Sequence, residues 1–248
     1  MIIIKIIIGI VGIAICIGII ALMMDLVQKS THQAYGPYEK FFKRPLDAFL
    51  SSGALIVFLP VLLFTAILIR IKIGSPVIFS QTRIGKNEKP FKVYKFRTMT
   101  DERDKNGVLL PDEIRLTSFG KKIRSTSIDE LPEIINIIKG DMAIIGPRPL
   151  HTYYLPWYTK EQHKRHDVRP GLTGLAQAHG RNTVDWDDKF RMDVEYVNHI
   201  TFKGDLHIIL DTVKSVFKQE GISSSTSVTM EDFREYCKNK GRKQKNES

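Results

Sequence analysis

The sequence predicts a membrane-associated α/β protein, with two membrane helices followed by a small mixed helical domain that has a short β-hairpin and interfacial amphipathic helices. The first 69 residues hold two long apolar stretches, whereas the rest is as charged as a soluble domain. This second part combines a β-type segment with apolar residues at helical spacing. We expect five regions: a transmembrane helix (1–25), a linker (26–42), a re-entrant membrane helix (43–72), a cytosolic domain (73–222) and a C-terminal segment with a basic tail (223–248).

The first apolar stretch is long enough to cross a membrane. Residues 6–24 carry no charge and lie between Lys5 and Asp25, close to the roughly 20 residues that a hydrocarbon core requires. A cleaved signal peptide is the alternative, but the stretch is long for one, and residues 21–23 lack a small residue at the second cleavage position. We therefore expect a retained helix, which puts the N-terminus outside if the chain from Asp25 onward is cytosolic.

The second stretch, residues 46–69, has a proline in its middle and basic residues on both flanks. Because the flanks are Lys43, Arg44, Arg70 and Lys72, the positive-inside bias gives no direction of crossing. Proline removes a helical hydrogen bond and bends a helix. A helix that enters, bends at Pro60 and returns to the same face explains both features. A plain kinked spanning helix agrees with the composition equally well.

The segment after the second stretch predicts a short β-hairpin. Residues 75–80 and 90–97 are β-type and flank a turn-like segment at 85–88. One face of the hairpin is expected to carry Lys92, Lys95 and Arg97, a row that is also typical of a solvated edge strand. The charged residues 101–112 are expected to form a loop.

Two adjacent acidic residues stand at the start of a predicted helix. Ser127-Ile-Asp-Glu130 has the form of a capping box, and apolar residues follow at helical spacing up to Lys139-Gly140. Acidic residues there have an ordinary explanation, because they complement the helix dipole. Pro132 is better placed as the first helical residue, which would leave Asp129 and Glu130 just ahead of the helix. Either arrangement presents both carboxylates at the helix start.

A second polar motif is a stiff turn that holds an arginine. In Gly146-Pro-Arg-Pro149, Pro147 and Pro149 flank Arg148, whose planar guanidinium suits bidentate contact with phosphate. Arg169 and Arg181 stand in similar turns, although such turns are common in loops. The net charge is +10, and +8 of it lies in residues 70–248. This balance favours nucleic acid, anionic lipid or a phosphorylated substrate as partner.

The last third of the chain predicts two helices, at 186–197 and 206–217, and the second either packs in the core or lies on a membrane surface. Residues 223–227 read as a linker and residues 238–245 as a solvated basic tail. Cys16 and Cys237 provide no disulfide framework. His163 and His166 lack a third ligand, so we expect no zinc site.

Taken together, five segments resemble the small monotopic phosphoglycosyl transferases of the PglC type, which start bacterial glycan assembly. They are residues 91–99, 124–131, 139–142, 146–149 and 169–177, and the similarity extends over roughly 43–233. The resemblance implies transfer of a sugar 1-phosphate from a UDP-sugar, N-acetylated, to polyprenyl (undecaprenyl) phosphate, with release of UMP. It places the protein in the bacterial cytoplasmic (inner) membrane, with the catalytic domain on the cytosolic face.

The resemblance also implies roles for individual residues. Asp129 and Glu130 would be the catalytic pair, with Asp129 as the nucleophile of a covalent intermediate and Mg²⁺ held by both. Substrate binding would fall to Lys95, Arg97, Arg124, Pro147, Arg148, Pro149 and Arg181. Expected partners are the UDP-sugar, polyprenyl phosphate and membrane lipid, with a second copy of the chain as a candidate and nucleic acid excluded. Two departures stand out, namely Leu59-Pro60 where the family has Ser-Pro, and the additional first helix.

Two other functions agree with part of the sequence. A membrane-tethered nucleic-acid-binding protein fits the pI of about 9.5, but it leaves two adjacent carboxylates among basic residues without explanation. A phosphohydrolase would use the same carboxylates with water as the acceptor. Dependence of product formation on polyprenyl phosphate distinguishes a hydrolase from a transferase.

Overall fold

The computed structural model describes residues 36–180, 184–217 and 231–242, together with a few residues between 15 and 23. Of the expected first helix, residues 15, 16, 18–20, 22 and 23 are helical, and the remainder lies outside the described residues. Arg181 and the expected linker at 223–227 also lie outside them. Within the described part, one helical segment, Tyr38–Lys72, is long and apolar enough to cross a membrane.

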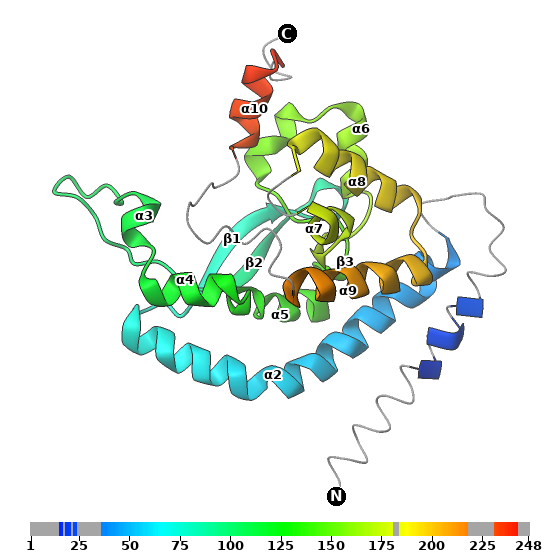
Figure 1. Cartoon of the computed structure of the whole chain (residues 1–248), viewed down its shortest axis with the longest axis horizontal. Helices are drawn as coiled ribbons and strands as arrows, with labels where there is room; N and C mark the ends of the chain where they lie inside the picture. The colour runs from blue at the N-terminus through cyan, green and yellow to red at the C-terminus, as the bar shows by residue number, and fades with distance from the viewer. Residues whose placement is uncertain are drawn as a thin grey trace, which may run out of the picture.

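This segment is a continuous helix that bends beneath the rest of the molecule. The π-helical η1 (Tyr38–Lys43) leads into α2 (Arg44–Lys72), which contains Pro60. Figure 1 shows α2 as a bow whose two ends rise toward the domain. Residues 56–61 in its middle are exposed, whereas its buried residues gather near the ends, at Leu46, Asp47, Ser51, Thr65 and Ile69. The proline accounts for a bend at mid-helix, since it removes one backbone hydrogen bond and crowds the preceding turn.

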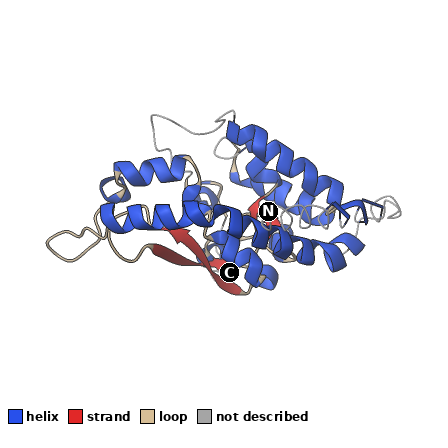
Figure 2. Cartoon of the chain, turned by 90° about the horizontal axis from the view of Figure 1, so that it is seen from below, coloured by secondary structure: helices blue, strands red, loops and turns tan. Residues whose placement is uncertain are grey.

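The longer strands form a twisted antiparallel pair, β1 (Ile78–Ile84) and β2 (Pro90–Phe96), which is clear in Figure 2. Between them lies η2 (Lys86–Glu88), in the segment expected to turn. Side chains alternate along a strand, so Lys92 lies on the face opposite Lys95, and Arg97 lies beyond the end of β2. The expectation that one face carries all three residues is therefore wrong.

A second, two-stranded sheet holds the arginine turn. The strands β3 (Ala143–Ile145) and β4 (Gly171–Thr173) run parallel. Their backbones come so close that a Cβ on Gly171 would lie 2.1 Å from the Gly146 nitrogen. Only glycine allows this approach, and the residues after Gly146 are thereby fixed against β4.

The helix α5 (Glu133–Lys139) lies along the outer edge of β2. Asn136 is completely buried and makes the connection through its side-chain amide. Its Oδ1 accepts a hydrogen bond from the Tyr94 nitrogen at 3.0 Å, and its Nδ2 donates to the Lys92 carbonyl at 2.8 Å. The amide thus takes the place of a neighbouring strand at this point of the edge. It satisfies two backbone groups of β2 that an open edge would leave unpaired.

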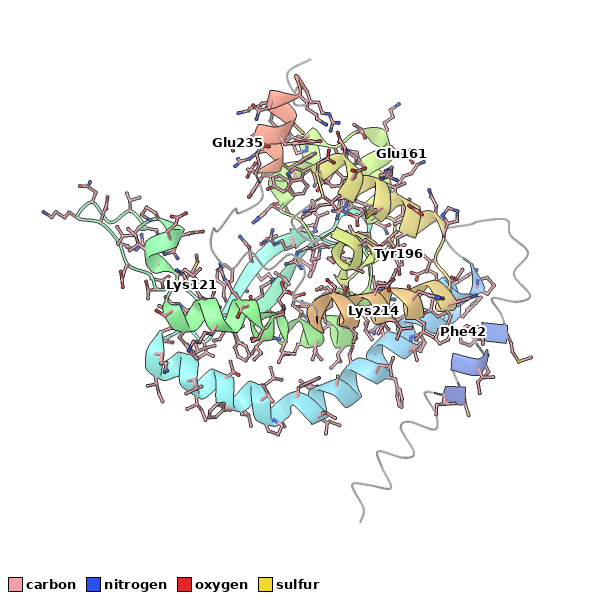
Figure 3. All side chains as sticks on the ribbon, in the orientation of Figure 1. Phe42, Lys121, Glu161, Tyr196, Lys214 and Glu235 are labelled. Carbon is pink, nitrogen blue, oxygen red and sulfur yellow. The ribbon has the colours of Figure 1, made fainter. Side chains whose placement is uncertain are left out.

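The remaining elements surround these sheets. The expected helices at 186–197 and 206–217 are confirmed as α8 and α9, and Tyr196 of α8 lies inside, next to α9 (Figure 3). The loop expected at 101–112 is largely confirmed, since α3 begins at its last residue. The full set is α3 (Asp112–Arg115), α4 (Ser118–Ser125), η3 (Ile128–Glu130), η4 (Thr152–Trp157), α6 (Lys160–His163), η5 (Lys164–His166), α7 (Leu175–Gly180), α8 (Trp186–Asn198), α9 (Phe202–Phe217) and α10 (Phe233–Asn239).

The C-terminal residues are folded where a solvated tail was expected. Phe233 and Cys237 of α10 are completely buried in an aromatic cluster that includes Tyr154, Tyr158, Trp186 and Phe190. Lys240 and Arg242 form ion pairs with Asp187 at 2.9 and 2.8 Å. The expectation of a free basic tail from residue 238 is therefore wrong at least as far as Arg242, because α8 supplies both an apolar surface and a counter-charge.

Ionic contacts fasten the start of the membrane helix to the domain. Lys43 pairs with Asp205 of α9, and Asp47 pairs with Arg169 at 3.1 Å. Arg44 donates to the last carbonyls of α5, at 2.7 Å to Ile138. Because Arg169 is buried in this junction, the expectation that it repeats the phosphate-binding turn of Arg148 is wrong. Figure 3 shows Phe42 beside α9 at this end of α2, and Lys121 on α4 above the other end.

Candidate active site

The two acidic residues lie on a 3₁₀ turn ahead of α5. Ser127 adopts a left-handed conformation (φ 56°) and makes no side-chain capping bond, so the expected capping box is wrong. Pro132 occupies the cap position and α5 begins at Glu133. The alternative that both carboxylates precede the helix is thus confirmed. A left-handed serine costs about 1 kcal/mol, and here it turns the chain from α4 into η3, whose Glu130 nitrogen donates to the Ser127 carbonyl at 3.1 Å.

Glu130 is held between two cations from distant parts of the chain. Its Oε1 accepts from Lys95 Nζ at 2.6 Å and from the Arg148 guanidinium at 2.7 Å. Burial alone would raise the pKa of Glu130, but Arg148 and Lys95 outweigh it and hold the pKa well below its usual value. The carboxylate is therefore ionised throughout the physiological pH range.

Asp129 has a different environment. Its side chain is buried, with 9% of the residue exposed. Burial and the neighbouring Glu130 raise its pKa, while Lys95 and Arg124 act in the opposite direction. Among the residues that the structure describes, none forms an ion pair with Asp129. Its oxygens are thus near positive charge without being occupied by a cation.

Lys95 also contacts a third carboxylate, Glu133, at 3.2 Å. Glu133 is buried in the first turn of α5. Burial raises the pKa of Glu133 to about 7, with Glu130 adding to the shift and Lys95 opposing it. Glu133 is not among the site residues expected from the sequence. Its only signal was an acid in the first turn of a helix, for which complementing the dipole is the ordinary explanation.

The backbone around Arg148 is fixed while its side chain stays accessible. The Pro147 carbonyl accepts from the Gly171 nitrogen at 3.0 Å, and Arg165 donates to the Arg148 carbonyl at 2.8 Å. Arg165 is itself held by Asp193 of α8 at 2.7 Å, in a buried pair. Pro147 is buried and Pro149 half-buried, so they shape the turn. The Arg148 side chain is 47% exposed and points its guanidinium to Glu130.

Two other predicted residues differ in their placement. Arg124, in the last turn of α4, donates Nε to Thr98 Oγ1 at 3.0 Å and lies close enough to Asp129 to lower its pKa. Arg97 is buried and points elsewhere, with contacts to the Ser75 and Met99 carbonyls and to Asp101. The structure thus brings together Lys95, Arg124, Asp129, Glu130 and Arg148, and it leaves Arg97 outside this group.

The acidic pair suits a magnesium ion. Mg²⁺ prefers oxygen ligands and usually binds one or two carboxylates together with substrate phosphates. Asp129 and Glu130 are adjacent carboxylates, and no cationic side chain of the described residues is ion-paired with Asp129. In the described part of the chain no cluster of three or more acidic, histidine or cysteine residues forms a ready-made metal cage. An ion here would depend on phosphate oxygens for the remaining ligands.

The chain matches a known protein family over most of its length. The family described as bacterial sugar transferase matches residues 38–219. The chain is 54% identical to the uncharacterized sugar transferase EpsL of Bacillus subtilis, over 70% of this chain and 86% of that protein. It is 36% identical to the UDP-N-acetylgalactosamine-undecaprenyl-phosphate N-acetylgalactosaminephosphotransferase of Aeromonas hydrophila, and 33% identical to the undecaprenyl-phosphate galactose phosphotransferase of Salmonella typhimurium. Each match covers 73% of this chain but only 44% and 42% of those two relatives.

Proposed function

The chain belongs to the bacterial sugar transferase family, and we propose that it transfers a sugar 1-phosphate from a UDP-sugar, N-acetylated, to undecaprenyl phosphate with release of UMP. The observation that carries the proposal is Asp129, a buried carboxylate with no ion-pair partner among the described residues, surrounded by Lys95, Arg124 and Arg148. The name of the Aeromonas relative, which gives UDP-N-acetylgalactosamine and undecaprenyl phosphate, supports this donor and acceptor. The name of the Salmonella relative, which gives undecaprenyl phosphate and galactose, supports the acceptor.

In the first half of the reaction, an Asp129 oxygen attacks the phosphorus that bears the sugar. The bond from that phosphorus to the UMP oxygen breaks, and UMP leaves with the bonding electrons. A carboxylate is a suitable nucleophile, since the acyl phosphate it forms remains reactive. Lys95, Arg124 and Arg148 stabilise the charge that develops on the phosphoryl oxygens and on the leaving group, which is usually the largest catalytic contribution.

In the second half, a phosphate oxygen of undecaprenyl phosphate attacks the same phosphorus. The bond to Asp129 breaks, the carboxylate is restored, and the product is an undecaprenyl diphosphate sugar. Asp129 and Glu130 would hold Mg²⁺, which when bound screens the repulsion between the two anions that meet in each half. Glu130, fixed by Lys95 and Arg148, sets the position of this pair relative to the phosphates.

The membrane helix supports a location at the inner face of the bacterial cytoplasmic membrane. The acceptor is a lipid, so its phosphate must reach Asp129 from the membrane surface. A helix that enters the membrane and returns at Pro60 would place both ends of α2, and the domain fastened to them, on the cytosolic side. The bow of α2 in Figure 1 supports this topology, with its exposed apolar middle in contact with membrane lipid.

The test is to incubate the full-length protein with labelled UDP-sugars in the absence of lipid acceptor and to analyse its peptides by mass spectrometry. We expect a phosphosugar adduct on the Asp129 peptide, strongest with N-acetylated sugars, and none in a folded Asp129→Asn variant that has also lost turnover. UMP release only when both substrates are present, without an adduct, would mean direct transfer. Release of free sugar phosphate without acceptor would mean hydrolysis.

A further inference from the structure

A second arginine, Arg83, lies beside the Arg148 turn and was given no role by the sequence. The register of the hairpin pairs Arg83 with Phe91 and Phe79 with Lys95. Directly paired residues of antiparallel strands lie on the same face, and alternate residues of one strand share a face. Arg83 and Lys95 therefore lie on the same face of the β1–β2 pair, and Lys95 from that face reaches Glu130.

The chain that follows Arg148 fixes the position of Arg83. The Ile84 nitrogen donates to the Leu150 carbonyl at 3.0 Å, and Arg83 and His151 form an isolated antiparallel bridge. The arginine turn thus leads into a short third strand against the free edge of β1. Burial and the charge of Arg148 lower the pKa of Arg83, while Tyr153, Tyr154 and Glu133 act in the opposite direction. The two guanidinium groups are close enough to repel each other.

The two arginines differ in the anionic charge around them: Arg148 is paired with Glu130 and lies near Asp129 and Glu133, whereas Arg83 has no carboxylate partner within the described residues. The partner of the Arg83 guanidinium is the neutral Gln81 Oε1, at 2.7 Å. Within the described residues no carboxylate forms an ion pair with Arg83, and Glu130 already accepts from both Arg148 and Lys95. The charge of Arg148 disfavours the charged form of the half-buried Arg83, and this cost falls on Arg83. A bound polyanion removes that cost, and planar guanidinium groups are suited to phosphate oxygens.

We propose that Arg83 and Arg148 together bind the diphosphate of the donor, with Arg83 on the nucleoside-linked phosphate that leaves as UMP. The assignment rests on the proposed function and on the order of the residues. Arg148 contacts Glu130, next to Asp129. Arg83 is paired with Phe91, four residues along β2 from Lys95, and its charged and aromatic neighbours are Arg148, Glu133, Tyr153 and Tyr154. The attacked phosphate lies at the Asp129 end, and the other phosphate reaches Arg83. Beyond it, His151 and Tyr153 are stacked with ring centroids 4.6 Å apart.

The experiment compares Arg83→Gln and Arg83→Lys with Lys92→Gln, a matched control that removes an exposed cation from the opposite face of the same hairpin. Full-length protein in detergent is titrated with UMP by calorimetry, and KM is measured separately for the UDP-sugar and for undecaprenyl phosphate. Losing hydrogen bonds to a charged group predicts at least about tenfold weaker UMP binding in Arg83→Gln. The KM for the UDP-sugar rises, the KM for the acceptor and the melting temperature stay constant, and Arg83→Lys recovers part of the affinity.

Unchanged UMP affinity in a folded Arg83→Gln protein overturns the proposal and leaves Arg83 with only its bond to Gln81. A raised KM for undecaprenyl phosphate with normal UMP binding overturns it as well, because the acceptor phosphate would then occupy this position. Failure of the wild-type protein to release UMP from any UDP-sugar contradicts the proposed function instead. The UMP titration measures the contribution of Arg83 to binding without requiring turnover. Failure of the Arg83 proposal can therefore be distinguished from failure of the proposed function.

Discussion

Asp129 and Glu130 follow one another in the chain, yet their side chains have different surroundings. Glu130 accepts two charge-assisted hydrogen bonds that lower its pKa. Asp129 is buried, forms no ion pair with any residue that the structure describes, and has a raised pKa. Neighbouring acids whose environments shift their pKa values apart commonly have different tasks. In the proposed mechanism, Asp129, whose pKa is raised, is the nucleophile, and Glu130, fixed by two cations, anchors the site.

Arg148 tests whether guanidinium geometry matters at this site. Arg148→Lys keeps the positive charge but loses the planar fork, so we expect kcat/KM for the UDP-sugar to fall at least about tenfold in a folded protein. Steady-state UMP release measures the effect. A fully active Arg148→Lys enzyme would show that a point charge is sufficient. Since Arg165 holds the backbone of this residue rather than its side chain, the turn itself is expected to survive the change.

His166 predicts a pH dependence of stability. Burial and the adjacent Arg165 lower the pKa of His166 to about 2, so the unfolded chain, with an ordinary value of about 6.5, takes up the proton first. The stabilisation is complete above pH 6.5 and is lost as the pH falls, by about 1.4 kcal/mol per unit. We expect the melting temperature of the protein to drop between pH 6.5 and pH 5.

Replacing His166 by Phe should flatten that decline, because the imidazole lies against Tyr158 with ring centroids 5.4 Å apart and an apolar ring of similar size fits there. The matched control is His207→Gln on the exposed surface of α9, which should keep the wild-type slope. If the melting temperature of His166→Phe falls with pH as steeply as that of wild type, a group other than His166 causes the loss of stability.

At the scale of elements, α10 is part of the domain core. Phe233 is completely buried against Tyr154, Trp186 and Phe190. We expect Phe233→Ala to cost about 3–5 kcal/mol and to expose the C-terminal segment to protease. Glu235→Ala, on the exposed side of the same helix (Figure 3), should behave as wild type. Thermal melting in detergent and limited proteolysis measure both. If Phe233→Ala melts like wild type, α10 is dispensable for the fold.

At the scale of the whole molecule, α2 touches the domain near both of its ends and carries exposed apolar residues between them. The start is fastened by Lys43 to Asp205 and by Asp47 to Arg169. At the other end Ile69 packs with Phe96 and Ile123. A straight helix of this length would not keep both attachments. The contacts of the domain with the two ends of α2 therefore depend on the bend at Pro60.

This dependence predicts the effect of straightening the helix. In wild type, cysteines introduced at the exposed Lys40 and Arg70 should react only from the cytosolic side. Pro60→Leu restores the backbone hydrogen bond and should move part of the population to a spanning form, in which one flank reacts from outside. Membrane-impermeant maleimide labelling of intact cells distinguishes the two. Reaction of Arg70→Cys from outside in the protein that retains Pro60 would mean that α2 spans.

The sequence by itself determined the features that depend on local pattern. Apolar periodicity located α8 and α9, because it reports the buried face of a single helix. The length of an apolar stretch located the membrane helix. The position of Pro132 also predicted that Asp129 and Glu130 precede α5. This alternative is the correct one, because Ser127 does not form the capping box that the sequence also suggested.

Only the tertiary structure decided which charges meet. Lys95 and Arg148 stand 35 and 18 residues from Glu130, and they reach it through the packing of α5 against β2 and of β3 against β4. Arg148 and Arg169 look alike in sequence, yet one faces the carboxylates and the other pairs with Asp47. The placement of Arg83 and of the C-terminal basic residues likewise follows from strand register and from contact with Asp187. An isolated charge in a sequence specifies no partner, because its energy depends on burial and on neighbours that long-range packing alone supplies.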